Sequence, residues 1–221
     1  MKTILCYGDS NTWGYNPQTG ERYDHKTRWP MALKNLLNRN APGDESPDDP
    51  RYWVDEEGLC GRTSCREDPV EGDMNGLRQL MPILKSHSPL DIVVVMLGTN
   101  DLKIRYSPCA YDIARGVGRL VTAVKDSRTG PGDTAPQVLM ICPPPTADAP
   151  AFKNIFGDSV ELSKKLPGFY RRFAEECGAE FLDAGKIIQS SKADGIHLDP
   201  EEHYKLAAAV ADRVKKMEPG M

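Results

Sequence analysis

The chain has 221 residues, a length that suits one domain spanning residues 1–221. Its 28 Lys and Arg residues and 32 Asp and Glu residues give a formal net charge of −4, and no segment concentrates the basic residues. Binding to nucleic acid is therefore disfavoured, because it depends on neutralising phosphates. Hydrophobic residues at 39% and charged residues at 27% are typical of a globular protein and exclude a chain that is disordered throughout.

The apolar runs are too short for a membrane span. The longest covers residues 92–97, whereas a helix needs about 20 apolar residues to cross a bilayer. The N-terminal run at 4–7 stops at Gly8 and Asp9, so it has neither the length nor the cleavage site of a secretory signal. The sequence therefore predicts a cytoplasmic protein with no membrane partner.

The residue types that bind metals do not form a ligand pattern. The six cysteines, at positions 6, 60, 65, 109, 142 and 177, include no CxxC pair and have no histidine at zinc-ligand spacing. A disulfide framework suits a much smaller secreted chain, so we expect mostly reduced thiols. The acidic stretch 44–49 lacks the glycine and the terminal glutamate of an EF-hand loop. We expect no metal and no cofactor.

Short runs rich in β-branched and apolar residues alternate with longer stretches of helical period. In chain order, the predicted elements are a strand at 3–7, a helix at 29–38, a strand at 52–56, a helix at 76–86, a strand at 91–97, a helix at 110–125, a strand at 137–142, a helix at 158–177, a strand at 180–183 and a helix at 201–217. Of the two long Pro-rich connections, we expect 41–51 to be a solvated surface loop and 142–157 to shape a pocket.

Strands that alternate with helices predict a doubly wound α/β domain, in which a mostly parallel five-stranded sheet carries helices on both faces. In such folds the functional residues gather on loops at the carboxyl ends of the strands. Four polar segments occupy these positions, at 8–10, 58–62, 98–101 and 194–197.

Ser10 follows the first strand and is the candidate nucleophile. A serine needs a base to accept its proton, and only His197 among the four histidines follows an acidic residue, Asp194, by three positions in a tight turn. The carboxylate of Asp194 would orient one ring nitrogen and leave the other free to face Ser10. An isolated serine is more often a helix cap, so the prediction depends on the shared edge of the sheet.

Two further segments offer donors for the oxyanion that attack by a serine creates. Asn100 follows the most hydrophobic strand, and its amide NH₂ can donate to a developing negative charge. The alternative is that Asn100 only satisfies backbone groups of its loop. Gly61 offers a main-chain N–H with no side chain to obstruct close approach.

Together these four segments resemble the four blocks of the SGNH (GDSL-type) hydrolase family, in the family's order. The stretches at 4–10, 12–14, 56–59, 96–101 and 143–145 also resemble its short-chain arylesterase and acyltransferase branch. The resemblance implies a flavodoxin-like fold, with Ser10 as nucleophile, His197 as general base and then acid, and Asp194 as its orienting partner. It also implies an oxyanion hole made by the main-chain N–H groups of Ser10 and Gly61 and the side chain of Asn100.

Substrate preference is less constrained by these motifs. Asn11 stands where the family usually has leucine, which we expect to alter the polarity of the pocket rather than the catalytic residues. The candidates for lining the substrate pocket are Asn11, Trp13, Met96, Phe152, Ile155 and Phe156. Each of the apolar ones is equally plausible as ordinary packing.

The leading interpretation is a serine esterase that takes a small-molecule ester with a short acyl chain on an aryl or simple alkyl alcohol, with acyl transfer to alcohols or peroxide when water is excluded. A carbohydrate acetylesterase is the alternative, because a polar Asn11 suits a sugar. A non-catalytic ligand-binding or phosphoacceptor α/β module rests on fold analogy alone. Because the resembling branch contains homo-oligomers, we also expect a homo-oligomer whose contacts through 142–157 narrow the active-site entrance.

Overall fold

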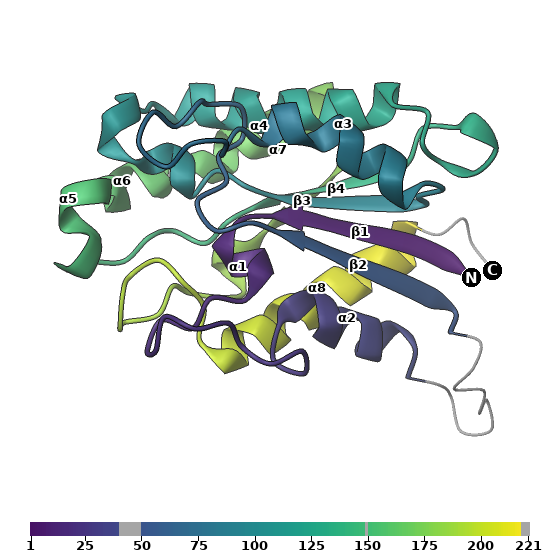
Figure 1. The fold of residues 1–221 in the computed structure, drawn as a ribbon, viewed down its shortest axis with the longest axis horizontal. Helices are drawn as coiled ribbons and strands as arrows, with labels where there is room; N and C mark the ends of the chain where they lie inside the picture. Colours follow the sequence, from purple (N-terminus) through teal and green to yellow (C-terminus); the bar gives the residue numbers. More distant parts are fainter. Residues whose placement is uncertain (40–49, 149, 218–221) are drawn as a thin grey trace.

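A computed structural model describes residues 1–39, 50–148 and 150–217. Five strands form one sheet between two layers of helices (Figure 1). The strands are β1 (Lys2–Gly8), β2 (Tyr52–Gly58), β3 (Ile92–Met96), β4 (Gln137–Cys142) and β5 (Glu180–Asp183), which confirms the five predicted strands. The predicted surface loop 41–51 falls almost wholly outside the described residues, as does the acidic stretch 44–49.

The strand order in the sheet is β2-β1-β3-β4-β5, and every neighbouring pair is parallel. The sheet is thus wholly parallel where the sequence predicted a mostly parallel one. The order reverses at β1, because β2 lies on one side of it and β3, β4 and β5 follow on the other. In doubly wound sheets, ligands bind at the carboxyl ends of the strands next to such a reversal.

Each face of the sheet carries its own hydrophobic core, because neighbouring residues of a strand point to opposite faces. Leu5 and Tyr7 of β1 belong to one core and Ile4 and Cys6 to the other. The first core is covered by α3 (Gly76–His87), α4 (Ala110–Asp126) and α7 (Leu166–Glu176), and the second by α2 (Trp29–Leu37) and α8 (Pro200–Met217). Figure 1 shows these two helical layers above and below the sheet.

The helix predicted over 158–177 is wrong in one respect, because the structure divides it into α6 (Ser159–Ser163) and α7. Pro167 has no N–H to donate to the carbonyl of Ser163, so a continuous helix would lose a hydrogen bond there. The chain restarts instead, with Pro167 in the first turn of α7, where its missing donor costs nothing.

Shorter helical segments connect the main elements. They are α1 (Ser10–Trp13), α5 (Lys153–Phe156) and the 3-10 helices η1 (Asn100–Leu102), η2 (Ile104–Tyr106), η3 (Pro131–Asp133), η4 (Pro150–Phe152) and η5 (Ala184–Lys186). Within the described ranges, no helix combines the length and the apolar character that a membrane span requires. All six cysteines carry free thiols, and Cys6 and Cys142 are buried in β1 and β4.

Candidate active site

The carboxyl end of β1 positions Ser10. Asp9 leaves the strand in an extended conformation and caps α1, accepting a hydrogen bond from the N–H of Asn11 at 3.0 Å. Gly8 is required at this close turn, because a Cβ there would overlap the side chain of Thr12. Ser10 is therefore the first residue of the one-turn helix α1, which follows the carboxyl end of β1 (Figure 1).

Asp194, His197 and Ser10 form a continuous chain of hydrogen bonds. Asp194 Oδ2 lies 2.5 Å from His197 Nδ1, and His197 Nε2 lies 2.9 Å from Ser10 Oγ. The other carboxylate oxygen, Oδ1, accepts from the N–H groups of Ile196 and His197 at 2.9 Å each. Gly195 allows the turn to close, since its φ of +76° favours glycine. The structure thus brings together the three residues that the sequence singled out.

Electrostatics decides which ring nitrogen of His197 carries the proton. Burial raises the pKa of Asp194, but the hydrogen bond and the charge of His197, together with two backbone N–H groups, outweigh burial and hold this pKa below its ordinary value. Asp194 is therefore ionised at neutral pH and can only accept hydrogen bonds. Nδ1 then donates to Asp194, and Nε2 presents its lone pair to the hydroxyl of Ser10.

Two aromatic rings hold the imidazole of His197 from the other sides. Tyr15 stacks on it with ring centroids 4.0 Å apart and an interplanar angle of 29°, and Phe152 approaches edge-on at 6.1 Å. The sequence analysis did not single out Tyr15. Its position depends on Gly14, which ends α1 in the left-handed conformation and turns the chain back over His197. No sequence motif signals that turn.

Three residues that line the cavity beside Ser10 Oγ carry hydrogen-bond donors. Gly61 has a φ of +86°, and its N–H, like that of Ser10, donates to no other described residue. Asn100 uses one amide hydrogen to donate to the carbonyl of Arg62 at 3.2 Å, which leaves the other hydrogen free. All three residues line one cavity, so the set can stabilise an oxyanion there.

Arg62 secures the loop that carries Gly61. Its guanidinium donates to the carbonyls of Gly8 at 2.8 Å and of Glu57 at 2.5 Å, and it lies 4.2 Å from the centre of the Tyr7 ring. The loop is thereby attached to the ends of β1 and β2. Burial lowers the pKa of Arg62, whose neighbours oppose the shift, and the guanidinium remains a cation.

A second attachment joins the Gly61 loop to the segment after β3. Asp101 is fully buried and accepts from the N–H of Ser64 at 2.8 Å and from its hydroxyl at 2.6 Å. Burial raises the pKa of Asp101, against the lowering effect of the Ser64 hydrogen bonds and of Arg66. Since Asp101 follows Asn100 directly, the contact fixes Gly61 and Asn100 relative to each other. The sequence did not indicate this contact, because a pairing between two loops that are 37 positions apart leaves no periodic pattern.

The cavity beside Ser10 has a volume of about 170 Å³. One wall is apolar and consists of Phe152, Ile155, Phe156 and Ile196. The other walls include Tyr15, Cys60, Glu71 and Lys103, none of which the sequence analysis had assigned. Among the described residues, no group of three or more His, Cys, Asp or Glu is arranged to hold a metal ion.

The cavity excludes three of the predicted pocket residues. Asn11 is buried beneath it and donates to the carbonyl of Ile196 at 3.4 Å, so its amide faces the turn of Asp194 rather than the cavity. Trp13 turns outward, where the guanidinium of Arg22 lies 5.2 Å from its ring centre. Met96 belongs to the core on the α2 and α8 face. Phe152, Ile155 and Phe156 do line the cavity.

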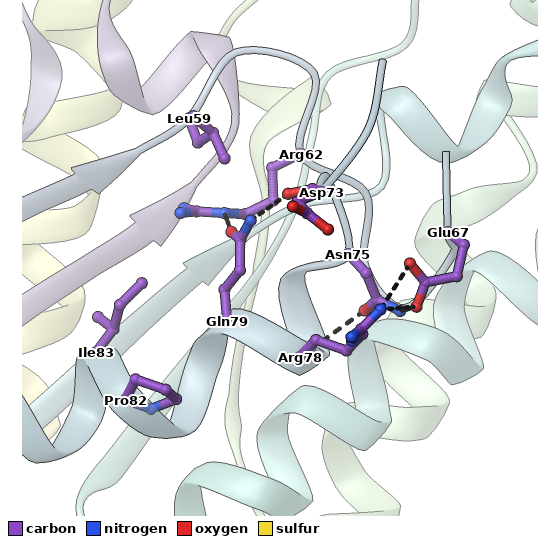
Figure 2. A pocket seen from close by; sticks show the side chains of 9 residues that line it. All are labelled: Leu59, Arg62, Glu67, Asp73, Asn75, Arg78, Gln79, Pro82 and Ile83. Carbon is purple, nitrogen blue, oxygen red and sulfur yellow. Dashed lines mark hydrogen bonds and ion pairs between the residues drawn. The ribbon is translucent and has the colours of Figure 1, made fainter. Parts of the chain in front are cut away.

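A separate cavity of about 600 Å³ lies between the Gly61 loop and α3 (Figure 2). Arg62 and Gln79 meet there, with Nε donating to Oε1 at 3.0 Å, and Glu67 pairs with Arg78 at 3.3 Å. Ser10 and His197 do not line it. Leu59 and Arg62, which flank Gly61 in its loop, line this cavity, but Gly61 itself does not.

Comparison with known proteins places this geometry in a family. The sequence pattern of the GDSL-like Lipase/Acylhydrolase family matches residues 6–204. A carbohydrate acetylesterase from Sinorhizobium meliloti shares 38% sequence identity, covers 99% of this chain and 100% of its own, and superposes with a TM-score of 0.89. The aryl esterase of M. smegmatis shares 37% identity with the same coverage and TM-score.

A curated relative is more distant. An acetylxylan esterase from Xylanibacter ruminicola is 22% identical over 230 residues, which include 96% of this chain but 43% of the relative. The chain thus spans less than half the length of that protein. The predicted class of carboxylic ester hydrolase and the resemblance to the SGNH (GDSL-type) hydrolases are confirmed by these matches. With 199 of its 221 residues covered by the family's pattern, the chain belongs to the GDSL-like lipase/acylhydrolase family.

Proposed function

We propose that the chain is a serine esterase that hydrolyses short-chain acyl esters of aryl or simple alkyl alcohols through an acyl-enzyme. The observation that carries this proposal is the hydrogen-bonded chain from Asp194 through His197 to Ser10, which ends at a small cavity lined by Gly61 and Asn100. At about 170 Å³ the cavity is smaller than the roughly 300–1,000 Å³ of pockets for drug-sized ligands, which favours a small acyl group.

The geometry supports a two-step reaction. Ser10 Oγ attacks the ester carbonyl while His197 Nε2 takes the hydroxyl proton, and the resulting oxyanion accepts hydrogen bonds from the N–H groups of Ser10 and Gly61 and from Asn100 Nδ2. The carbon–oxygen bond to the alcohol then breaks, and the alcohol leaves with the proton from His197. Water, another alcohol or a peroxide then gives a proton to His197 and attacks the acyl carbonyl. The bond to Ser10 Oγ breaks, the acyl product leaves, and His197 returns the proton to Ser10.

The test is hydrolysis of aryl esters from acetate to octanoate by the wild-type enzyme and by Ser10→Ala. We expect rates that are highest for the shortest chains and that fall at least about 1,000-fold in the variant, because the nucleophile is gone. A maximum at long chains would contradict the short-acyl assignment but not the mechanism. Equal turnover by both proteins, or failure of a serine-reactive phosphonate to label Ser10, would favour a non-catalytic binding protein instead.

A carbohydrate acetylesterase is the second candidate. The relatives named above include a carbohydrate acetylesterase and an acetylxylan esterase. Asn11 lies outside the cavity and does not support this candidate, but the carboxylate of Glu71 lines the cavity and can accept a hydrogen bond from a hydroxylated substrate. Faster hydrolysis of an acetylated sugar than of phenyl acetate would favour this candidate.

A homo-oligomer and a cytoplasmic location are further proposals. The side chain of Ile104 is 53% exposed and lies against Gly157, at the end of the segment expected to make subunit contacts. Light scattering tests this proposal, since a species of only 24.5 kDa would contradict it. Fractionation of cells that express the chain tests the location.

A further inference from the structure

Glu71 occupies the wall of the catalytic cavity beside the oxyanion donors. If Gly61 carried a Cβ, that atom would lie 2.6 Å from Glu71 Oε2, so the carboxylate fills the space on the side-chain face of Gly61. Both residues line the cavity that contains Ser10. The requirement for glycine at position 61 therefore has two causes, its positive φ and the adjacent carboxylate.

Only one oxygen of this carboxylate is satisfied by the protein. Oε1 accepts from Lys103 Nζ at 2.7 Å and lies 3.4 Å from Arg105 Nη2. Among the residues that the structure describes, none donates a hydrogen bond to Oε2. The side chain is 35% exposed, so a molecule in the cavity can reach this second oxygen.

The position of Glu71 is fixed before any substrate binds. Lys103 is 3% exposed and also lies 3.4 Å from Asp68 Oδ2. Asp68, whose side chain is fully buried, accepts from Tyr106 Oη at 2.6 Å and from Arg105 Nη1 at 2.8 Å. Burial would raise the pKa of Asp68, but these hydrogen bonds, those of backbone N–H groups and the charge of Lys103 hold it well below its ordinary value. The network of ion pairs holds the carboxylate of Glu71 in place.

A fixed acceptor next to an oxyanion hole disfavours a wholly apolar substrate. A carboxylate oxygen repels the negative charge that develops on the carbonyl oxygen, unless a donor lies between them. The apolar side chains of Phe152, Ile155 and Phe156 line the same cavity and provide a place for a short acyl chain. The carboxylate of Glu71 is then left to contact the alcohol part of the ester.

We propose that Glu71 Oε2 accepts a hydrogen bond from a hydroxyl group on the carbon next to the ester-bearing carbon of the alcohol. The preferred substrates are then short-acyl monoesters of vicinal diols and polyols. This inference rests on the proposed esterase function and specifies the alcohol part of its ester substrate. Lys103 and Arg105 orient Glu71 and do not themselves bind the hydroxyl.

The experiment uses two esters that differ in one hydrogen-bond donor, 2-hydroxyethyl acetate and 2-methoxyethyl acetate. For the wild-type enzyme we expect kcat/KM to be roughly tenfold higher for the hydroxyl ester, the value of a hydrogen bond to a charged group. In Glu71→Gln the amide oxygen takes the place of Oε1, because Lys103 and Arg105 are donors, and the NH₂ then faces the cavity. The hydroxyl oxygen of one substrate and the methoxy oxygen of the other can both accept from that NH₂. The ratio of the two kcat/KM values should therefore fall to about one.

Glu67→Gln is the matched control. It removes the same charge from the same loop at an exposed side chain that pairs with Arg78, and it should leave the ratio at its wild-type value. Thermal unfolding of all three proteins verifies that they fold. A wild-type ratio near one, or a ratio that Glu71→Gln does not change, would overturn the inference while Ser10-dependent hydrolysis of phenyl acetate persists.

A preference on the acyl side would also overturn it. If ethyl glycolate is favoured over ethyl methoxyacetate while the alcohol pair shows no preference, Glu71 recognises a hydroxylated acyl group and the assignment to the alcohol is wrong. If the wild-type enzyme hydrolyses neither phenyl acetate nor the glycol esters, the proposed function itself has failed, and the inference fails with it.

Discussion

Asp9 directly precedes Ser10, the proposed nucleophile, and the residue is only 1% exposed. Burial raises its pKa from the ordinary value of 3.8 to about 6, and the hydrogen bond from the Asn11 N–H, with the charges of His197 and Arg62, only partly opposes this. Capping α1 with an ionised side chain at neutral pH is therefore costly. This free-energy cost of ionising Asp9 arises at one side chain, so a single substitution can measure it.

Asp9→Asn should stabilise the protein at neutral pH. Between pH 3.8 and about 6 the folded chain binds the Asp9 proton more tightly than the unfolded chain, so stability falls as pH rises through this window. Asparagine caps helices equally well and does not ionise. In urea unfolding, the variant should gain about 2 kcal/mol relative to wild type between pH 4.5 and pH 7.5. A difference that is the same at both pH values would contradict the raised pKa.

Tyr15 is expected to position His197 rather than to touch the substrate's ester bond. Its ring covers the imidazole at 4.0 Å, and an aromatic face stabilises the imidazolium that forms during the reaction. Tyr15→Ala should lower kcat for phenyl acetate about tenfold with a smaller change in KM, and Tyr15→Phe should restore it. Loss of activity in Tyr15→Phe would show that the hydroxyl, and not the ring, is what matters.

Among the elements, the loop after β2 and the segment after β3 act as one unit because Asp101 joins them. Asp101→Ala would leave the buried N–H of Ser64 without its acceptor and its hydroxyl with only the sulfur of Cys65 at 3.8 Å, so we expect a loss of about 2 kcal/mol in the free energy of unfolding. Gly61 and Asn100 would lose their fixed separation, and kcat should fall at least tenfold. Urea unfolding and steady-state kinetics of the same preparation check both effects; a stable variant with unchanged kcat would refute the coupling.

The elements also show why some features could be predicted and others could not. The strands are buried runs such as 92–96, whose β-branched residues and short length favour a strand, and their parallel order follows from the intervening helices. The positions of Ser10, Asn100, Asp194 and His197 at strand exits followed from the same reasoning. Asn11 and Trp13 were predicted to line the pocket and do not. The directions in which α1 points its side chains depend on contacts with other parts of the chain, such as that of Asn11 with Ile196.

Loop geometry accounts for the residues that no sequence pattern indicated. Glu71 reaches the cavity only because Asp68 and Lys103 hold the loop after β2 against η2, and this contact spans more than 30 positions. Contacts of this kind depend on exact backbone paths and have no periodicity to detect. The sequence thus singled out the three residues that the structure joins by hydrogen bonds, while the residues that determine the shape and polarity of the cavity required the structure.

At the scale of the whole molecule, the buried His203 on α8 links protonation to folding. It is fully buried and accepts from the N–H of Trp29 at 3.3 Å, which joins α8 to α2. Burial lowers its pKa from 6.5 to about 3, aided by the charges of His197 and Arg28. The folded protein therefore keeps this ring neutral in a range where the unfolded chain protonates it.

His203→Gln should make the stability of the protein less dependent on acid. For the wild type, the contribution of His203 is fully present above pH 6.5 and is lost as pH falls toward 3, because the unfolded state then binds more protons. Between pH 7 and pH 5 this loss is about 2 kcal/mol. The variant will be less stable at pH 7, since the buried packing changes, but its stability should decline less over this range. Parallel declines in urea unfolding would show that His203 does not control acid stability.

Ser10 and His197, whose side chains are hydrogen-bonded, lie 187 positions apart in the sequence. Ser10 follows β1, and His197 precedes α8. β1 becomes an inner strand only when β2 and β3 pair with it, and Ser10 gains its proposed base only from the segment before α8. Because a growing chain emerges from its N-terminus, Ser10 is synthesised well before His197 and stays without its base over the 187 positions between them. Hydrolysis therefore requires that this whole stretch is made and folded, and a chain interrupted before His197 should be inactive.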